Sequence, residues 1–150
     1  MSPNQWGPPI WTLFHCLAEK IKEDKFREIG PQLFSFIKKI CLYLPCPDCS
    51  MHATSFLSKV KFEYINNKTD FKHLFYAFHN IVNRRKRKSL FNVTNLPTYS
   101  KMNLINAFNN FVGAYHTKGN MKLIADSFQR NLAVKEFRQW FMNNYKNFDQ

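Results

Sequence analysis

Two cysteines separated by two residues carry the most reactive chemistry in this chain. Cys46 and Cys49 lie in the stretch Leu44-Pro45-Cys46-Pro47-Asp48-Cys49-Ser50-Met51-His52. This stretch ends one apolar-periodic segment and opens the next, which predicts that the pair lies at or just inside a helix N-terminus. Unpaired backbone N–H groups and the positive end of the helix dipole favour a thiolate there, the form that attacks disulfides or binds metal. The spacing indicates redox chemistry or a metal site, and the alternative is a pair of buried, inert thiols.

Zinc binding and a thioredoxin-like module are two common uses of such a pair. Cys46, Cys49 and His52 would supply three zinc ligands, with His15 or His79 as the fourth. Structural zinc sites usually combine two short-spaced ligand couples, and this chain has one, so we expect no metal. The residues before Cys46 are helical in period and include no Val/Ile-rich strand, so a thioredoxin-like fold does not fit.

Flat aromatic and hydrogen-bonding side chains recur at helical spacing outside the cysteine pair. They are Trp11, His15, His52, His79 and Asn83, which belong to three different predicted helices. A lone residue of this kind is usually a satisfied, half-buried polar side chain. Because three helices each present such groups on their side faces, we expect them to sandwich a flat ligand next to the thiols.

The chain is strongly basic and contains the run Arg84-Arg85-Lys86-Arg87-Lys88. It has 22 Lys and Arg against 10 Asp and Glu, a formal net charge of +12. Such a charge attracts anionic partners without choosing among them. The run is open to three interpretations: a nucleic-acid patch or localisation signal, a solvated helix end, or a set in which Arg85, Lys86 or Lys88 meets the phosphates of a cofactor.

Length and composition predict a single helical core. The chain has 150 residues, of which 45% are hydrophobic and 16 are Phe, enough for one core and with no demand for a second domain. Only 4 Gly are present, without turns spaced for hairpins, which favours helices over a sandwich or barrel. We find no secretory signal and no run long enough to span a bilayer, so the expected compartment is cytosolic and reducing.

Apolar residues at helical spacing predict five helices and then one long or two short further helices. They are expected at about residues 9–23, from Leu33 to Leu44, from the cysteines to Val60, from Phe71 into the basic run, from Ser100 to Tyr115, and from Met121 to Tyr145. We expect Gly30-Pro31 to break the chain before the second helix and Thr69 or Asp70 to cap the fourth.

Three motifs follow one another along the chain. They are Trp6-Gly7-Pro8-Pro9-Ile10-Trp11-Thr12-Leu13-Phe14-His15, the cysteine stretch, and His79-Asn80-Ile81-Val82-Asn83 with Lys88 following. Together they resemble the Erv/ALR family of FAD-linked sulfhydryl oxidases, in the short form encoded by large cytoplasmic double-stranded DNA viruses. The resemblance implies an all-α fold: a four-helix bundle holding FAD over residues 1–95, with 96–150 a C-terminal helical extension packed on the same domain.

The resemblance also implies an activity and residue roles. The family forms disulfides in a protein substrate and passes the electrons to O2, producing H2O2, usually as a homodimer. Cys49 would be the flavin-proximal thiol and Cys46 the outer thiol that exchanges with substrate. The implied FAD contacts are Gly7, Trp11, His15, Cys49 and His52 on the flavin side, His79, Asn80, Val82 and Asn83 towards the adenine and ribose, and Arg85 and Lys88 near the phosphates.

Departures from the family pattern shape the expected partners. No second Cys-x-x-Cys is present to act as a shuttle, so the enzyme would meet its dithiol substrate directly, and a small redox protein is the expected partner. Cys16 and Cys41 read as buried thiols first and as an auxiliary or intersubunit disulfide second. The resemblance implies a location in host cytoplasm and virion. The rival hypothesis is a non-enzymatic, basic helical nucleic-acid-binding module with structural or zinc-bound cysteines.

Overall fold

Helices form the regular structure of the described part of the chain, which is residues 3–116 and 124–150 of a computed structural model. The helices are α1 (Pro3–Lys20), α2 (Phe26–Leu42), α3 (Pro47–Ser58), α4 (Lys68–Arg85), α5 (Leu104–Tyr115) and α6 (Ile124–Asn144). Short 3-10 turns are η1 (Glu23–Lys25), η2 (Phe62–Tyr64), η3 (Val93–Lys101) and η5 (Tyr145–Asn147). The all-α prediction is confirmed.

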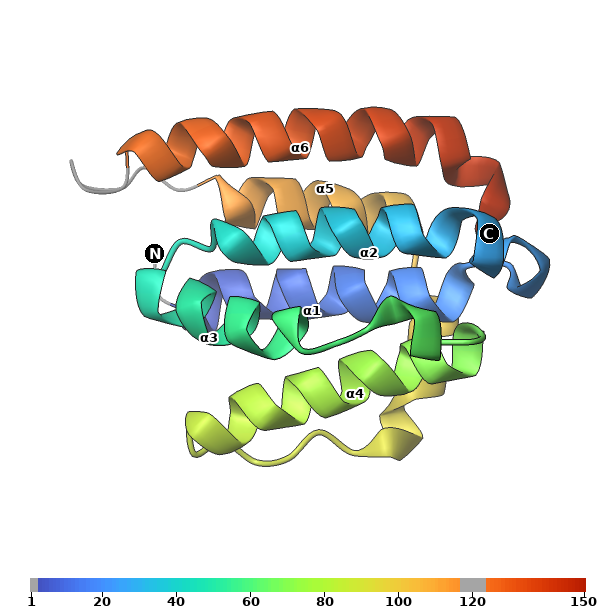
Figure 1. Ribbon diagram of the computed structural model, residues 1–150, viewed down its shortest axis with the longest axis horizontal. Coiled ribbons are helices and arrows are strands. Elements are labelled where there is room, and N and C mark those ends of the chain that lie inside the picture. The colour runs from blue at the N-terminus through green and yellow to red at the C-terminus, as the bar shows by residue number, and fades with distance from the viewer. Residues whose placement is uncertain (1–2, 117–123) are drawn as a thin grey trace.

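Helix α1 lies inside the molecule, and the other elements surround it. It packs against α4, α5 and η3, while α2 packs against α3 and α6. In Figure 1, α6 runs along the top, α5 and α2 lie below it, and α4 closes the bottom. The described helices bury one continuous, Phe-rich core, in which Phe14, Phe75, Phe111 and Phe137 are at most 1% exposed. No helix of the described ranges is long and apolar enough to cross a membrane.

Prolines and a glycine lie inside two helices, where the sequence predicted boundaries. Helix α1 begins at Pro3 and ends at Lys20, so the predicted bounds of about 9–23 were wrong. Pro8 and Pro9 remove two N–H donors near the start of the helix, yet the helix continues through them. The predicted break at Gly30-Pro31 is also wrong, since α2 runs through both residues. A Cβ at Gly30 would lie 3.2 Å from the rings of Phe26 and Phe62, so this glycine allows close packing and does not end the helix.

Helix starts depend on caps that the sequence indicated only in part. Helix α3 begins at Pro47, directly after Cys46, as predicted. Helix α4 is capped by Asn67, whose Oδ1 accepts a hydrogen bond from the N–H of Asp70 at 2.8 Å, so the prediction of Thr69 or Asp70 as the cap was wrong. Helix α5 begins at Leu104, later than the predicted Ser100, because η3 occupies the residues before it.

The stretch predicted from residue 121 to residue 145 forms the single helix α6 from Ile124. Residues 121–123 lie outside the described part of the chain. Within the described ranges, the choice between one long helix and two short ones is settled in favour of one.

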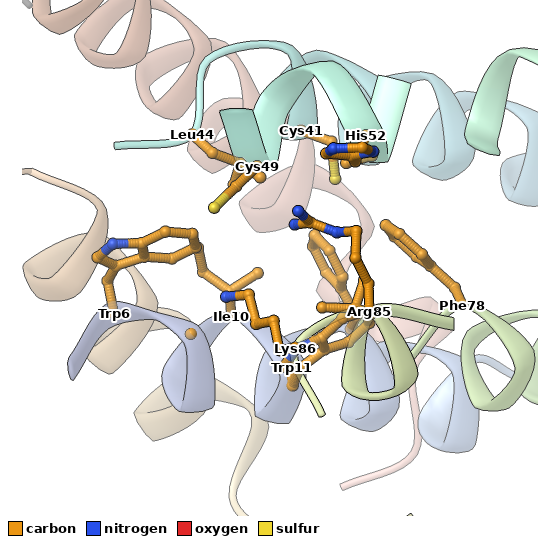
Figure 2. Close-up of a pocket in the computed structure, with 14 residues that line it drawn as sticks. Trp6, Ile10, Trp11, Cys41, Leu44, Cys49, His52, Phe78, Arg85 and Lys86 are labelled. Carbon is orange, nitrogen blue, oxygen red and sulfur yellow. The ribbon is translucent and has the colours of Figure 1, made fainter. Parts of the chain in front are cut away.

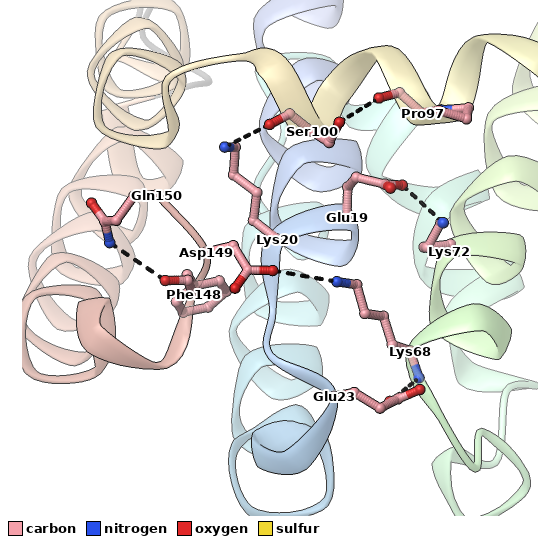
Figure 3. A network of polar contacts seen from close by, with 10 residues as sticks. All are labelled: Glu19, Lys20, Glu23, Lys68, Lys72, Pro97, Ser100, Phe148, Asp149 and Gln150. Carbon is pink, nitrogen blue, oxygen red and sulfur yellow. Dashed lines mark hydrogen bonds and ion pairs between the residues drawn. The ribbon is translucent and has the colours of Figure 1, made fainter.

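Residues distant in sequence meet at the end of α1. Ile21 and Phe148, both fully buried, form the one antiparallel bridge among the described residues. The N–H of Asp149 donates to the carbonyl of Lys20 at 2.6 Å. The Lys20 ammonium donates to the carbonyl of Ser100 at 3.0 Å (Figure 3). These contacts tie the C-terminal extension to the start of the fold.

Candidate redox and cofactor site

The redox pair occupies the first turn of α3. Cys46 and Cys49 form a disulfide with their Cα atoms 5.2 Å apart. Cys46 is the N-cap residue, and its Sγ accepts a hydrogen bond from the N–H of Cys49 at 3.2 Å. Cys46 is partly exposed while Cys49 is 8% exposed. An attacking thiolate therefore reaches the sulfur of Cys46 more readily, and Cys49 lies at the positive end of a helix dipole that stabilises its thiolate.

A largely apolar cavity begins at Cys49. Its volume is about 490 Å³, counting its open mouth. In Figure 2, the sulfur of Cys49 points towards the cavity from α3, Trp6 and Ile10 form the α1 side, and the Arg85 guanidinium reaches in from α4. The full lining is Trp6, Gly7, Ile10, Trp11, Phe14, Cys41, Leu44, Cys49, His52, Ala53, Phe78, Val82, Arg85 and Lys86.

A second, more polar cavity adjoins the first. Its volume is about 690 Å³, and its walls are Gly7, Pro8, Trp11, Thr12, His79, Val82, Asn83, Lys86, Lys88 and Tyr99. Four residues line both cavities: Gly7, Trp11, Val82 and Lys86. Burial, followed by the charges of Lys88 and Arg85, lowers the pKa of Lys86. The site thus changes from an apolar region at the thiols to a basic region beyond Val82.

An aromatic cluster forms the inner wall next to the second cavity. The rings of Trp11 and His79 stack at 4.2 Å with an 8° interplanar angle. His15 stacks on Tyr99 and Phe91 at 4.8 and 5.1 Å. Since Trp11 and His79 already touch, no third ring fits between them, and the predicted sandwich around a flat ligand is wrong for this pair. A flat ligand would have to lie along the free faces and edges of these rings.

His15 and His79 form a buried, neutral pair. Nε2 of His15 lies 2.9 Å from Nδ1 of His79, so one ring donates a proton to the other in a hydrogen bond. Burial, followed by the neighbouring His79, lowers the pKa of His15 from 6.5 to about 3. Burial and the charge of Lys88 lower the pKa of His79 to about 4. Both rings are therefore uncharged at neutral pH.

Most of the predicted contact residues line the two cavities. Gly7, Trp11, Cys49, His52, Val82 and Arg85 border the first cavity, and His79, Asn83 and Lys88 border the second together with Gly7, Trp11 and Val82. His15 and Asn80 border neither cavity. The Asn80 amide instead donates to the carbonyl of Phe91 at 3.0 Å and accepts from its N–H at 2.6 Å, which holds Phe91 against His79.

Arg85 lies at the first cavity, separate from Lys88 at the second. Its Nη1 donates to Oδ2 of Asp48, the residue before Cys49, at 3.1 Å. The other carboxylate oxygen of Asp48 lies 3.5 Å from Nε2 of His52. Asp48, which lies between the two cysteines, thus contacts Arg85 of α4 and His52 of α3 beside the redox pair.

Sequence reasoning missed several walls of the site. Trp6 was quoted only as part of a motif, yet it is 4% exposed, lines the first cavity and lies 5.8 Å from the Lys86 ammonium. Its indole nitrogen is buried and has no hydrogen-bond partner among the described residues. Tyr99, from the 3-10 segment after Pro97, lines the second cavity and could not be found from motif spacing. The Trp-Gly-Pro spacing was the available signal for Trp6.

The two remaining cysteines are free and buried. Burial raises the pKa of the Cys16 thiol to about 11 and that of the Cys41 thiol still further. Cys16 lies 3.8 Å from the carbonyl oxygen of Tyr99, and Cys41 lines the first cavity. The prediction of buried thiols is confirmed. Within residues 3–116 and 124–150, no group of three His, Cys, Asp or Glu side chains is arranged to hold a metal ion.

Comparison with known proteins decides the family. The model described as "Erv1 / Alr family" matches residues 8–102, which include the cysteine pair and all the lining residues of the two cavities except Trp6 and Gly7. The chain belongs to the Erv1/Alr family. The resemblance inferred from three motifs is therefore confirmed, and the matched segment of this Erv1/Alr chain extends through η3.

Viral proteins are among the relatives of this Erv1/Alr chain. An FAD-linked sulfhydryl oxidase of African swine fever virus (Tick/Malawi isolate) is 28% identical over 114 residues, covering 73% of this chain and 95% of the relative. That of the Pig/Kenya isolate is 33% identical over 85 residues, or 57% and 71% of the two chains. A vaccinia virus protein named "Probable FAD-linked sulfhydryl oxidase" is 25% identical over 84 residues, or 55% and 81%. No solved structure gives a significant match.

Proposed function

We propose that this protein is an FAD-dependent thiol oxidase that forms disulfide bonds in a protein dithiol. The observation that carries the proposal is the position of the Cys46–Cys49 disulfide, with Cys46 open to a partner and Cys49 facing an apolar cavity that continues into a basic one. The Erv1/Alr family match and the viral relatives named as FAD-linked sulfhydryl oxidases support the same activity.

The chemistry of the two cavity walls matches the two halves of FAD. An apolar cavity bordered by Trp11 and Cys49 suits a flat, tricyclic ring next to a thiol. The buried indole N–H of Trp6 has no partner among the described residues and is available to a polar edge of that ring. Lys86 and Lys88 supply positive charge for a pyrophosphate, and Asn83 and His79 supply polar groups for the adenine half.

Disulfide exchange is the part of the reaction that the chain's own residues perform. A substrate thiolate attacks Sγ of Cys46, a mixed disulfide forms, and Cys49 leaves as a thiolate. The second substrate thiolate then attacks the substrate sulfur of the mixed disulfide. This step releases the thiolate of Cys46 and completes the substrate disulfide.

The electrons leave through the cofactor side of the site. When bound, FAD would supply the two-electron chemistry that returns the reduced pair to the disulfide and converts O2 to H2O2. The N-terminus of α3 stabilises the Cys49 thiolate, and Arg85, paired with Asp48, borders the same cavity. The apolar walls of Ile10, Phe78 and their neighbours limit the contact of water with the Cys49 side of the reduced pair.

The basic run borders the site and is also exposed. Arg85, Lys86 and Lys88 line the two cavities, and Arg85 pairs with Asp48. A bound pyrophosphate would use the cations that border the site. Because every residue of the run except Lys86 is exposed, its charge would also suit a nucleic acid, and the Erv1/Alr family match is what favours the oxidase.

Further parts of the proposal concern organisation and location. Residues 1–95 would form the FAD-binding bundle and residues 96–150 an extension packed on it. The partner would be a protein dithiol that meets the enzyme directly, because the chain has no second Cys-x-x-Cys. A small redox protein is the proposed partner. A homodimer and a location in host cytoplasm and virion are proposed from the family resemblance and the viral relatives.

The test combines flavin absorption with oxygen uptake. The purified protein, supplied with FAD, should show the visible spectrum of oxidised flavin and consume O2 when dithiothreitol is added under air. Cys49→Ser should keep the flavin spectrum and lose at least about a hundredfold of turnover, because the thiolate that delivers electrons is gone. Cys16→Ala, which removes a buried thiol outside the pair, is the matched control and should retain turnover. A colourless protein without O2 uptake, or full turnover in Cys49→Ser, would contradict the proposal.

A further inference from the structure

The C-terminal extension contacts the backbone just before the redox pair. Tyr115, the last residue of α5, is fully buried, and its hydroxyl donates to the carbonyl of Ile40 at 2.6 Å. Arg130 of α6 is also fully buried, and its Nη1 donates to the carbonyl of Tyr43 at 3.3 Å. Both acceptors belong to the C-terminal end of α2: Tyr43 is its C-cap residue, and the Ile40 carbonyl also accepts from the N–H of Tyr43 at 3.2 Å.

The segment of chain that follows these two carbonyls leads directly to the Cys46–Cys49 disulfide. We define the redox loop as residues 43–46, which connect the end of α2 to the N-cap of α3. The inner side of the loop is fixed by Ser50, whose Oγ accepts from the N–H of Leu44 at 2.7 Å. The outer side is fixed by Arg130 at Tyr43. The loop is thus held at two successive residues, once by α3 and once by the extension.

Arg130 is an unusual residue for a purely structural contact. Its Nε and Nη2 are buried and have no hydrogen-bond partner among the described residues. A buried guanidinium with unpaired N–H groups is costly, and a well-packed apolar side chain of similar volume would often be at least as stable. The charge is instead placed at the negative end of the α2 dipole, next to the loop that carries Cys46.

We propose that Arg130 is a positioning residue for the redox pair, with Tyr115 as a second anchor. By fixing the start of the redox loop, it keeps Sγ of Cys46 within reach of Cys49 after the disulfide has opened, and so favours closure. The inference rests on the proposed function only in taking Cys46 and Cys49 as the redox pair. It assigns a role in the reaction to the segment beyond residue 96.

The effect is measurable as a disulfide equilibrium. In this reduction, the protein disulfide and two glutathione thiols give the protein dithiol and one glutathione disulfide. The two electrons from the glutathione thiols end in the cysteine pair. Freeing roughly one backbone residue of the loop should lower the effective concentration of Cys46 at Cys49 by about tenfold. The equilibrium constant for reduction should rise by the same factor, and a tenfold change corresponds to about 30 mV for this two-electron couple.

The experiment uses the FAD-loaded protein in anaerobic glutathione buffers, with acid quenching, thiol alkylation and mass analysis of the peptide holding Cys46 and Cys49. Arg130→Met should make the disulfide about tenfold easier to reduce. Arg130→Lys, which keeps a cationic donor, should stay within about threefold of the unsubstituted protein. Tyr115→Phe should shift the equilibrium in the same direction as Arg130→Met, and it serves if Arg130→Met does not fold.

Trp140→Phe is the matched control, because the indole N–H of Trp140 donates to Oε1 of Gln32 at 2.6 Å and joins the same two helices away from the redox loop. It should lower the melting temperature without changing the reduction equilibrium. The inference is overturned if Arg130→Met changes only the melting temperature, or if Trp140→Phe shifts the equilibrium equally. A protein that neither binds FAD nor takes up O2 would refute the proposed oxidase. The glutathione equilibrium measured for that protein would still test the role of Arg130.

Discussion

The neutral pair of His15 and His79 makes the stability of this protein depend on pH. Both folded-state pKa values lie below the unfolded value of 6.5, at about 3 and about 4. Below pH 6.5 the two histidines bind protons in the unfolded chain but not in the folded protein, so acid favours unfolding. The contribution of the pair is complete above the unfolded pKa and is lost as pH falls towards the folded values.

The size of this loss follows from the two shifts. Between about pH 7.5 and about pH 5.5, each histidine that stays neutral in the folded state costs about 1.4 kcal/mol of unfolding free energy, one pKa unit's worth. His15 is 2% exposed, so solvent screening reduces its share little, whereas His79 is only partly buried and its share is smaller. The pair should therefore remove about 2 kcal/mol, a large part of the stability of an ordinary domain.

Urea unfolding at the two pH values, followed by tryptophan fluorescence with FAD held at one saturating concentration, measures the loss. In His15→Gln one titrating ring is absent and the amide can still meet His79, so the pH-dependent loss should fall by about half. The matched control is His73→Gln, which removes an exposed histidine of α4 and should keep the full loss. An equal loss in His15→Gln and in the unsubstituted protein would refute the neutral, buried pair.

Two further substitutions test the packing around the site. Asn80→Ala removes both hydrogen bonds to the backbone of Phe91 and should cost about 2 kcal/mol, seen as a fall of several degrees in the melting temperature; an unchanged melting temperature would contradict this anchor. Gly30→Val places a branched side chain against the rings of Phe26 and Phe62, already 3.2 Å from an added Cβ, and should destabilise by about 1–3 kcal/mol in chemical denaturation. Equal or greater stability of that variant would mean that the two rings move aside.

Local signals in the sequence predicted the helices well where tertiary contacts agree with them. The start of α3 at Cys46-Pro47 followed from a proline, a change of apolar register and a cap position. The Gly30-Pro31 boundary failed because the purpose of Gly30 depends on Phe62, a residue more than one helix away. Local rules treat glycine as a breaker and contain no information on which ring will approach it.

The site was predicted by residue type but not by arrangement. Motif spacing identified Trp11, His79 and Lys88, which do line the cavities. It could not show that Trp11 and His79 stack on each other or that the Asn80 amide holds the chain at Phe91. Nor could it find Arg130, because its contact with the redox loop depends on how α6 crosses α2.

The bridge between Ile21 and Phe148 affects the order in which the molecule is made. Ribosomes add about 5–20 residues per second, so α1 is made on the order of ten seconds before Phe148, the bridge partner of Ile21. Until α5 has been made, the apolar side of α1 that α5 covers is open to chaperones and to other nascent chains. A chain stopped before residue 148 would lack this bridge, and the end of α1 would be held by fewer contacts.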